Sequence, residues 1–290
     1  MILGGVEAGG TKFVCLVGDD DGRVLAERRF PTRGPDDTLA EAVAALREMA
    51  AGTGPFAALG VGAFGPLDLG TGRLLATPKP GWSGADLVGP LRAAFGVPVG
   101  VDTDVTGAAM AEGRWGAARG LGTHAYVTVG TGIGVGVVAG GRPLRGLPHP
   151  EAGHVAVPRV PGDDFPGICP FHGDCWEGMA SGPAMAARWG VPAEALTGAD
   201  RDRAVDLEAA YIASGIRALV YVVAPERVLL GGGVAGLPGL VPRVREHLAT
   251  ALGGYPGLPE HAAPAFVQPA GLGGSAGPLG ALVIAAAAAG

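Results

Sequence analysis

The sequence predicts an α/β fold made of two related domains. Short Val/Ile/Leu-rich runs alternate with amphipathic helical stretches, and the order strands, hairpin, helix, strand, helix occurs twice with variation. Hydrophobic residues make up 48% of the 290 residues and charged residues 17%, so a sizeable core is available. The 54 glycines and 25 prolines would suit a disordered chain, but they fall between the apolar runs, where turns are needed.

Three strands open the chain, and the last two are expected to form a hairpin. The turn between them is predicted at Asp19-Asp20-Asp21-Gly22. A helix is predicted over 35–51, because apolar residues from Leu39 to Met49 recur at helical spacing behind two aspartates. The other elements expected in the first half are strands 2–6, 12–17, 24–30, 58–64 and 97–101 and helices 85–95 and 105–115.

The second half repeats this order around a different turn. A strand at 125–129, a turn at Gly130-Thr131-Gly132 and a return strand at 135–139 are predicted first. The remaining elements are expected as helices 182–189, 206–223, 240–252 and 276–289 and strands 227–230 and 265–267. The boundary between the halves is expected around 104–120.

Bulk properties narrow the function classes. A net charge of −6 gives no electrostatic reason to expect nucleic acid. Three cysteines make no disulfide framework, and Cys15 lies in an apolar run as a buried thiol, which indicates a reducing cytoplasm. The first residues lack a signal-peptide pattern. The apolar run 279–289 is too short to span a bilayer, which takes about 20 helical residues.

The stretch from His154 to Glu177 predicts a metal site. Cys169-x2-His172-x2-Cys175, with His154 upstream, offers two thiolates and two imidazoles, the ligand set of a closed tetrahedral zinc site. The alternative is a pair of reduced cysteines near an unrelated histidine. Four protein ligands leave no open position on the metal, so a zinc hydrolase is excluded.

Two Gly/Thr-rich turns suggest phosphate binding. They are Glu7-Ala8-Gly9-Gly10-Thr11-Lys12 and Gly130-Thr131-Gly132-Ile133-Gly134, and their backbone N–H groups could approach phosphate oxygens closely. Each alone could be a plain glycine hairpin turn, but two in corresponding halves could grip a triphosphate from both sides. The P-loop pattern is absent. Gly231-x-Gly233-x-x-Gly236 lacks the acidic residue of a dinucleotide site and is interpreted as a nucleoside contact.

Asp104 is the candidate general base. It stands where a strand ends and a helix begins, and there it could accept a hydroxyl proton as an alcohol attacks a γ-phosphate. Two other interpretations stay open: Asp104 as an ordinary helix N-cap, and Asp102 as the base.

The motifs resemble those of the ROK sugar kinases. Glu7-Ala-Gly-Gly-Thr-Lys12, Asp102-Thr-Asp-Val105, Gly130-Thr-Gly-Ile-Gly134, Glu151-Ala-Gly-His154 and Cys169-Pro-Phe-His-Gly-Asp-Cys175 occur in that family's order. GVEAGGTKF, TPKPGW, HPEAGH and CPFHGDCWEG are most similar to the bacterial fructokinase branch. The resemblance implies a two-domain, actin-like (ribonuclease-H-like) kinase fold with a cleft between residues 1–115 plus 277–290 and residues 116–276.

The resemblance also implies roles for individual residues. ATP with Mg²⁺ would bind through Gly9, Gly10, Thr11, Lys12, Gly130, Thr131 and Gly132, with Gly231, Gly232 and Gly233 at the adenosine. Asp104 would be the general base, and Thr103, Glu151, His154 and Glu177 would contact the sugar. Zinc would be held by His154, Cys169, His172 and Cys175 and would order the sugar-binding segment.

Some positions depart from the family pattern and leave the sugar open. Glu7 replaces an Asp, and Thr103 and Thr106 replace Asn. Pro78-Lys79-Pro80-Gly81-Trp82 either walls the sugar pocket or is a turn with a packed Trp. We expect a cytoplasmic homodimer that converts fructose to fructose 6-phosphate. The alternatives are a kinase for mannose, glucose or an N-acetylhexosamine, or a non-catalytic sugar-responsive regulator, which in this family carries a helix-turn-helix ahead of the first loop.

Overall fold

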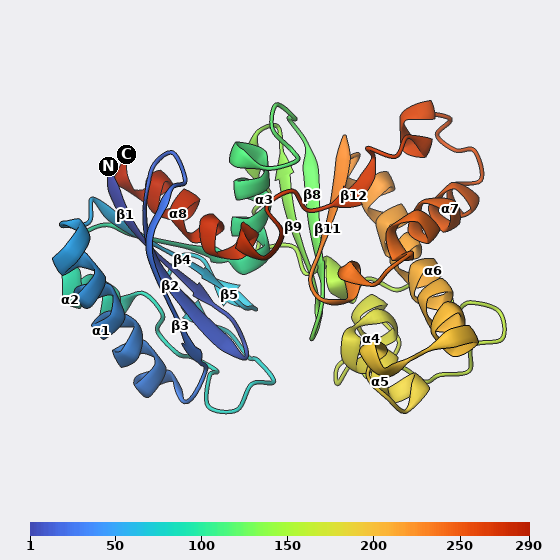
Figure 1. Ribbon diagram of the computed structural model, residues 1–290, viewed down its shortest axis with the longest axis horizontal. Helices are drawn as coiled ribbons and strands as arrows, with labels where there is room; N and C mark the ends of the chain where they lie inside the picture. Colours follow the sequence, from blue (N-terminus) through green and yellow to red (C-terminus); the bar gives the residue numbers. More distant parts are fainter. The chain divides into compact units, whose positions relative to one another are not determined.

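The computed structural model describes residues 1–290 and places them in two compact units (Figure 1). Unit 1 comprises residues 1–119, 143–150 and 275–290, and unit 2 comprises residues 120–142 and 151–274. Each unit has its own hydrophobic core around one five-stranded sheet. None of the helices combines the length and the apolar character that crossing a bilayer would require.

The sheet of unit 1 has the strand order β3-β2-β1-β4-β7. Its strands are β1 (Ile2–Ala8), β2 (Lys12–Asp19), β3 (Val24–Pro31), β4 (Ala58–Ala63) and β7 (Val99–Thr103). The first three pair antiparallel, and β4 and β7 continue parallel to β1. The carboxyl ends of β1, β4 and β7 therefore meet at one edge of the sheet, where the first glycine loop and Asp104 begin.

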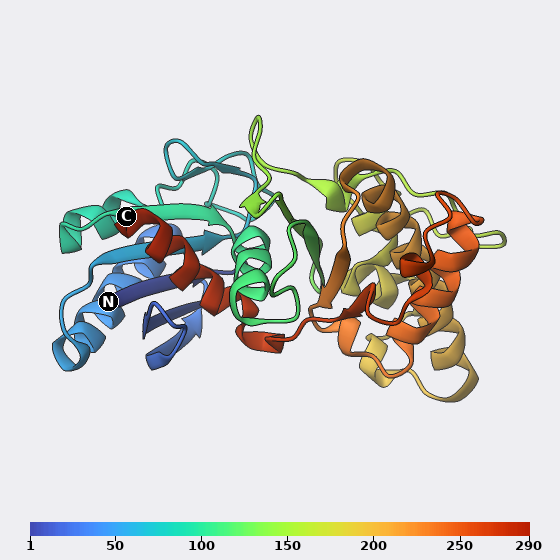
Figure 2. The same cartoon turned by 90° about the horizontal axis from the view of Figure 1, so that it is seen from above.

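Helices cover both faces of this sheet. α1 (Pro35–Thr53) packs on one face, where the sulfur of Cys15 approaches the carbonyl of Ala42, and α2 (Gly89–Phe95) lies beside it. α8 (Ala276–Ala289) crosses the other face next to α3 (Asp104–Trp115), as Figure 2 shows. A two-stranded hairpin, β5 (Leu67–Asp68) and β6 (Arg73–Leu74), completes the unit.

Glycines allow α8 to lie directly on its neighbours. A Cβ on Gly60 of β4 would stand 2.0 Å from the carbonyl oxygen of Ala281, and one on Gly280 would stand 2.3 Å from the carbonyl carbon of Gly107 in α3. Since real Cβ atoms do not make such contacts, only glycine fits at both positions. This close approach explains how an Ala-rich helix can bury most of its surface.

Unit 2 repeats the hairpin followed by parallel strands. Its sheet has the order β10-β9-β8-β11-β12, with β8 antiparallel to β9 and parallel to β11, and β12 parallel to β11. The strands are β8 (His124–Val129), β9 (Ile133–Ala139), β10 (Arg142–Pro143), β11 (Arg227–Gly231) and β12 (Val267–Pro269). The duplicated order expected from the sequence is thus present.

The helices of unit 2 pack around α6 (Gly198–Val223). Trp176 lies against Gly215, where a Cβ would meet the indole at 2.1 Å. The other elements are α4 (Trp176–Ala180), α5 (Gly182–Trp189), α7 (Leu240–Leu252) and the short 3-10 turns η1 (Ala152–His154), η2 (Ala193–Ala195), η3 (Val234–Gly236), η4 (Pro259–Ala262) and η5 (Gly273–Ser275).

Candidate functional site

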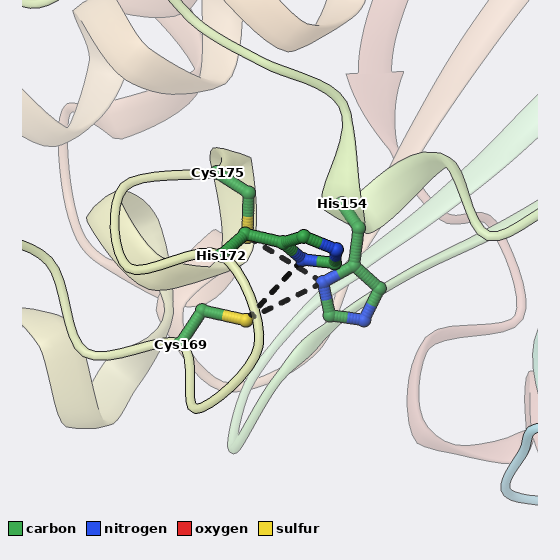
Figure 3. Close-up of side chains that lie close together, drawn as sticks. All are labelled: His154, Cys169, His172 and Cys175. Carbon is green, nitrogen blue, oxygen red and sulfur yellow. Dashed lines mark hydrogen bonds between the residues drawn. The ribbon is translucent and has the colours of Figure 1, made fainter.

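The four predicted metal ligands converge in unit 2 (Figure 3). Nδ1 of His154 lies 3.4 Å from Sγ of Cys175 and 3.7 Å from Sγ of Cys169, and Nδ1 of His172 lies 3.6 Å from Sγ of Cys169. Zn–S bonds of about 2.3 Å and Zn–N bonds of about 2.05 Å in a tetrahedron require S···N separations of about 3.5 Å. These three separations match a tetrahedral zinc site, and all four donor atoms lie within 4.8 Å of one another, so the group could hold a metal ion.

The sequence folds around this cluster through a tight turn. The N–H of Cys169 donates to the carbonyl of Gly173, and the N–H of Gly173 donates back to the carbonyl of Cys169. Gly173 has a φ of +67°, which favours glycine. Burial raises the pKa of the Cys175 thiol to about 11. A cation at the site would therefore supply the stabilisation that thiolates need there.

The turn formed by residues 169–175 is linked through α4 to the second glycine loop. Cys175 precedes α4, and Glu177 in α4 accepts a hydrogen bond from the N–H of Ile133 at 3.0 Å. A Cβ on Gly132 would come within 2.6 Å of the same carboxylate. Glu177, predicted to contact sugar, thus holds the Gly130–Gly134 loop in this structure. Glu151 precedes η1, which carries His154.

The second glycine loop and the Gly231–Gly233 turn lie side by side in unit 2. A Cβ on Gly232 would stand 2.3 Å from the carbonyl oxygen of Val129, and the φ of Gly232 is +87°. The N–H of Gly182 at the start of α5 donates to the carbonyl of Gly130. Two predicted nucleotide-binding turns therefore meet at the carboxyl ends of β8 and β11.

The first glycine loop in unit 1 joins β1 to β2. The N–H of Gly9 donates to the carbonyl of Lys12, while Gly10, Thr11 and Lys12 are exposed. Nζ of Lys79 donates to the carbonyl of Gly10 at 2.5 Å. The Pro78–Trp82 segment thus lies against this loop.

Trp82 decides between the two interpretations of that segment. Its side chain is fully buried, packs against Phe13 and Phe64 and donates its Nε1–H to the carbonyl of Arg33. The interpretation of a turn with a packed Trp therefore holds for Trp82.

Two carboxylates, Glu7 and Asp104, lie close enough beside this loop for the charge of one to affect the other. Burial, and then the nearby charge of Asp104, raises the pKa of Glu7 to about 7, while Lys12 opposes the shift. Asp104 is the first residue of α3 and is half-buried, and its Oδ1 accepts the N–H of Val105. Glu7 and Asp104 thus form an acidic pair at the edge where β1 and β7 end.

The helix cap is Thr103 and not Asp104. The Thr103 hydroxyl accepts the N–H of Thr106 at 3.1 Å and bonds the Thr106 hydroxyl, and the side chain is buried. The N-cap interpretation of Asp104 is therefore wrong, since Thr103 performs that function one residue earlier. Thr103 was predicted to contact sugar; its hydroxyl here caps α3.

Two residues that the sequence analysis did not single out hold the segment 143–150 to unit 1. Arg145 forms an ion pair with the buried Asp102, and Nε2 of His149 accepts the N–H of Leu67 at 3.0 Å. Asp102 and Leu67 lie 43 and 82 residues away along the chain, so no local sequence pattern predicts these contacts.

Comparisons with known proteins place this geometry in a family. The model of the ROK family matches residues 3–288. The fructokinase of Zymomonas mobilis is 42% identical over 99% of this chain and 97% of its own length. Among solved structures, a ROK hexokinase from Thermus thermophilus has a TM-score of 0.83 and 32% identity, covering 99% of this chain and 98% of its own. A ROK glucokinase from Streptomyces griseus, in complex with glucose and AMPPNP, has a TM-score of 0.79 and 27% identity, covering 99% and 100%. The predicted two-domain, actin-like α/β fold is confirmed by these neighbours.

Proposed function

The chain belongs to the ROK family and is an ATP-dependent sugar kinase, and we propose that the sugar it phosphorylates is fructose, at the 6-hydroxyl. The observation that carries the choice of fructose is the 42% identity to a fructokinase across nearly the whole chain, against 27% to the glucokinase. The net charge of −6 gives no electrostatic reason to expect nucleic-acid binding.

Within each unit, the glycine turns are suited to nucleotide binding. In unit 2, the Gly130–Gly134 loop would contact phosphates and the adjacent Gly231–Gly233 turn the adenosine, because both leave backbone close to incoming ligand atoms. In unit 1, the exposed loop at Gly9–Lys12 would contact the transferred phosphoryl group. Glu7, beside the first glycine loop, offers the hard carboxylate oxygen that Mg²⁺ prefers, and Asp104 stays free to act as a base. Mg²⁺ would neutralise charge on the phosphates.

We propose that Asp104 is the general base. Its half-buried carboxylate sits at the start of α3 beside the first glycine loop. Asp102, the rival candidate, is committed elsewhere: its side chain is 1% exposed and paired with Arg145. A carboxylate saturated by a guanidinium and removed from solvent is poorly placed to take a proton from an alcohol.

We further propose that zinc orders the segment that leads to Glu177. His154, Cys169, His172 and Cys175 fill all four positions of a tetrahedral ion, so the metal would act as a structural centre. A homodimer remains part of the proposal by resemblance to the family.

ADP release by the purified protein with Mg²⁺ and ATP tests the function. Fructose, glucose, mannose, N-acetylglucosamine and N-acetylmannosamine would be compared at equal concentrations. A kcat/KM for fructose at least tenfold above the others is expected. Preference for another sugar would overturn the substrate, and turnover of none by zinc-loaded protein would favour a sugar-responsive regulator.

The same assay tests the general base. Asp104→Asn should lower kcat by at least 100-fold, because positioned bases contribute about 10²–10⁴-fold, while calorimetry should show unchanged ATP binding. Asp37→Asn, an exposed carboxylate at the start of α1, should match wild type. Retained turnover in Asp104→Asn would assign the base elsewhere.

A further inference from the structure

The segment 143–150 carries an arginine to the strand that ends at the proposed base. In sequence this segment lies between two stretches of unit 2, yet it belongs to unit 1. It is held there at two points, by Arg145 on Asp102 at the end of β7 and by His149 on Leu67 of β5. The position of Arg145 is therefore set by unit 1 itself.

Arg145 binds Asp102 with two nitrogens. Its Nε lies 3.0 Å and its Nη2 2.6 Å from Oδ2 of Asp102, while Oδ1 accepts the N–H of Thr103 at 2.8 Å. Both oxygens of a carboxylate that is 1% exposed are thus satisfied, one by the guanidinium and one by the backbone. A buried carboxylate that lost the guanidinium would have to move, take up a proton or admit water.

Any of these responses would affect Asp104, because two hydrogen bonds and one peptide bond connect it to Asp102. Asp102 Oδ1 fixes the amide of Thr103, the Thr103 hydroxyl caps α3, and Asp104 is the next residue and the first of that helix. The cap sets where the helix begins and hence the direction of its first side chain.

We propose that Arg145 is a positioning residue for the kinase reaction: through Asp102 it fixes the junction of β7 and α3 and so holds the Asp104 carboxylate in place. This rests on the proposed function of Asp104 as general base. Replacing a buried ion pair with apolar residues often leaves stability unchanged or raised. Fold stability alone therefore gives no reason for a half-exposed arginine to pair with a buried aspartate, whereas placement of a base within a fraction of an ångström does.

Three variants test the proposal: Arg145→Gln, Arg145→Lys and the matched control Arg142→Gln. Arg142 is exposed and lies three residues upstream on β10. Kinetics would use the sugar that the wild type turns over fastest, so a wrong choice of fructose would show in the wild type alone. Arg145→Gln should lower kcat at least tenfold with KM for ATP within twofold of wild type. Arg145→Lys should restore at least a third of the lost activity, and Arg142→Gln should match wild type.

A cycle with Asp102 separates positioning from general damage. If Arg145 acts through Asp102, Asp102→Asn should lower kcat, and the double variant Asp102→Asn/Arg145→Gln should be no worse than the poorer single variant. Additive losses, or a kcat for Arg145→Gln within twofold of wild type, would overturn the proposal. If Asp104→Asn itself kept turnover, the base assignment would fail on that separate result.

Hydrogen exchange provides a readout that needs no activity. Peptides covering residues 99–106 should exchange at least fivefold faster in Arg145→Gln than in Arg142→Gln, with Arg145→Lys between them, because the amide of Thr103 loses its fixed acceptor. Equal exchange in all variants would show that the junction does not depend on Arg145 and would overturn the proposal.

Discussion

At the scale of single residues, Glu7 makes the stability of the protein depend on pH. In the unfolded chain its carboxyl ionises near 4.5, whereas in the folded protein burial and Asp104 raise the pKa to about 7. The folded state is therefore favoured most below pH 4.5, and this contribution is lost as pH rises to about 7. At about 1.36 kcal/mol per pKa unit, the loss amounts to at most about 3 kcal/mol.

The variant Glu7→Gln should lack this loss. Relative to wild type, its free energy of unfolding should be about 2 kcal/mol higher at pH 7.5 than at pH 5, measured by denaturant titration of nucleotide-free protein. Glu194→Gln, on an exposed glutamate of unit 2, is the control. If the difference in free energy of unfolding between Glu7→Gln and wild type were the same at both pH values, the environment described for Glu7 would be wrong.

Local chemistry was the part of the site most open to prediction from sequence. Their spacing predicted that His154, Cys169, His172 and Cys175 cluster, because three of them lie within seven residues and one turn. The sequence did not predict the roles of Arg145 and His149, because the fold and not the nearby sequence determines their partners. Glu177 was singled out, but its bond to Ile133 depends on how α4 packs against β9.

At the scale of elements, a metal ion bound by His154, Cys169, His172 and Cys175 should hold the second glycine loop in place through α4. Removing metal with a chelator should lower the melting temperature, speed amide exchange of residues 130–134 and weaken sugar binding. Cys169→Ser should show the same changes without chelator and no further change with it. Metal-free protein with wild-type melting temperature and sugar affinity would exclude this role.

The contact between Gly107 of α3 and Gly280 of α8 should not tolerate an added side chain. Gly280→Ala places a Cβ against the backbone of Gly107 and should destabilise the fold by about 1–3 kcal/mol, because the backbone there cannot easily shift. Gly52→Ala, in α1 with nothing within 4 Å, should instead stabilise by about 0.5–1 kcal/mol. Chemical denaturation of both variants gives the comparison; similar effects would mean that α8 lies less tightly on α3.

Element types followed from periodicity, while their ends did not. The helix expected at 206–223 in fact begins at Gly198. The prediction missed its first turns because they are polar and show no apolar stripe. The strand expected at 97–101 runs instead from Val99 to Thr103. The two-residue strands β5 and β6 and the five-residue α4 gave no pattern, because each covers too few periods of its signal for a repeat to show.

At the scale of the whole molecule, we expect that one unit can lose its structure while the other keeps it, because each has its own core. α8 covers one face of the sheet in unit 1, whereas the core of unit 2 contains none of its residues. Deleting residues 276–290 should therefore expose that sheet. Limited proteolysis with mass spectrometry should show early cleavage within 1–119 and protection within 151–252. Equal cleavage of both regions, or protection of both, would contradict independent cores.

The membership of α8 in unit 1 also has a consequence for synthesis. Residues 1 and 290 lie at the same end of unit 1 (Figures 1 and 2), although the ribosome makes α8 more than 260 residues after β1. While the ribosome is still at work, unit 2 can bury its core before unit 1 receives the helix that seals its sheet. The usual order, in which the amino-terminal part folds first, is thus reversed, and chaperones would have to shield the nascent sheet of β1, β4 and β7 until α8 has been made.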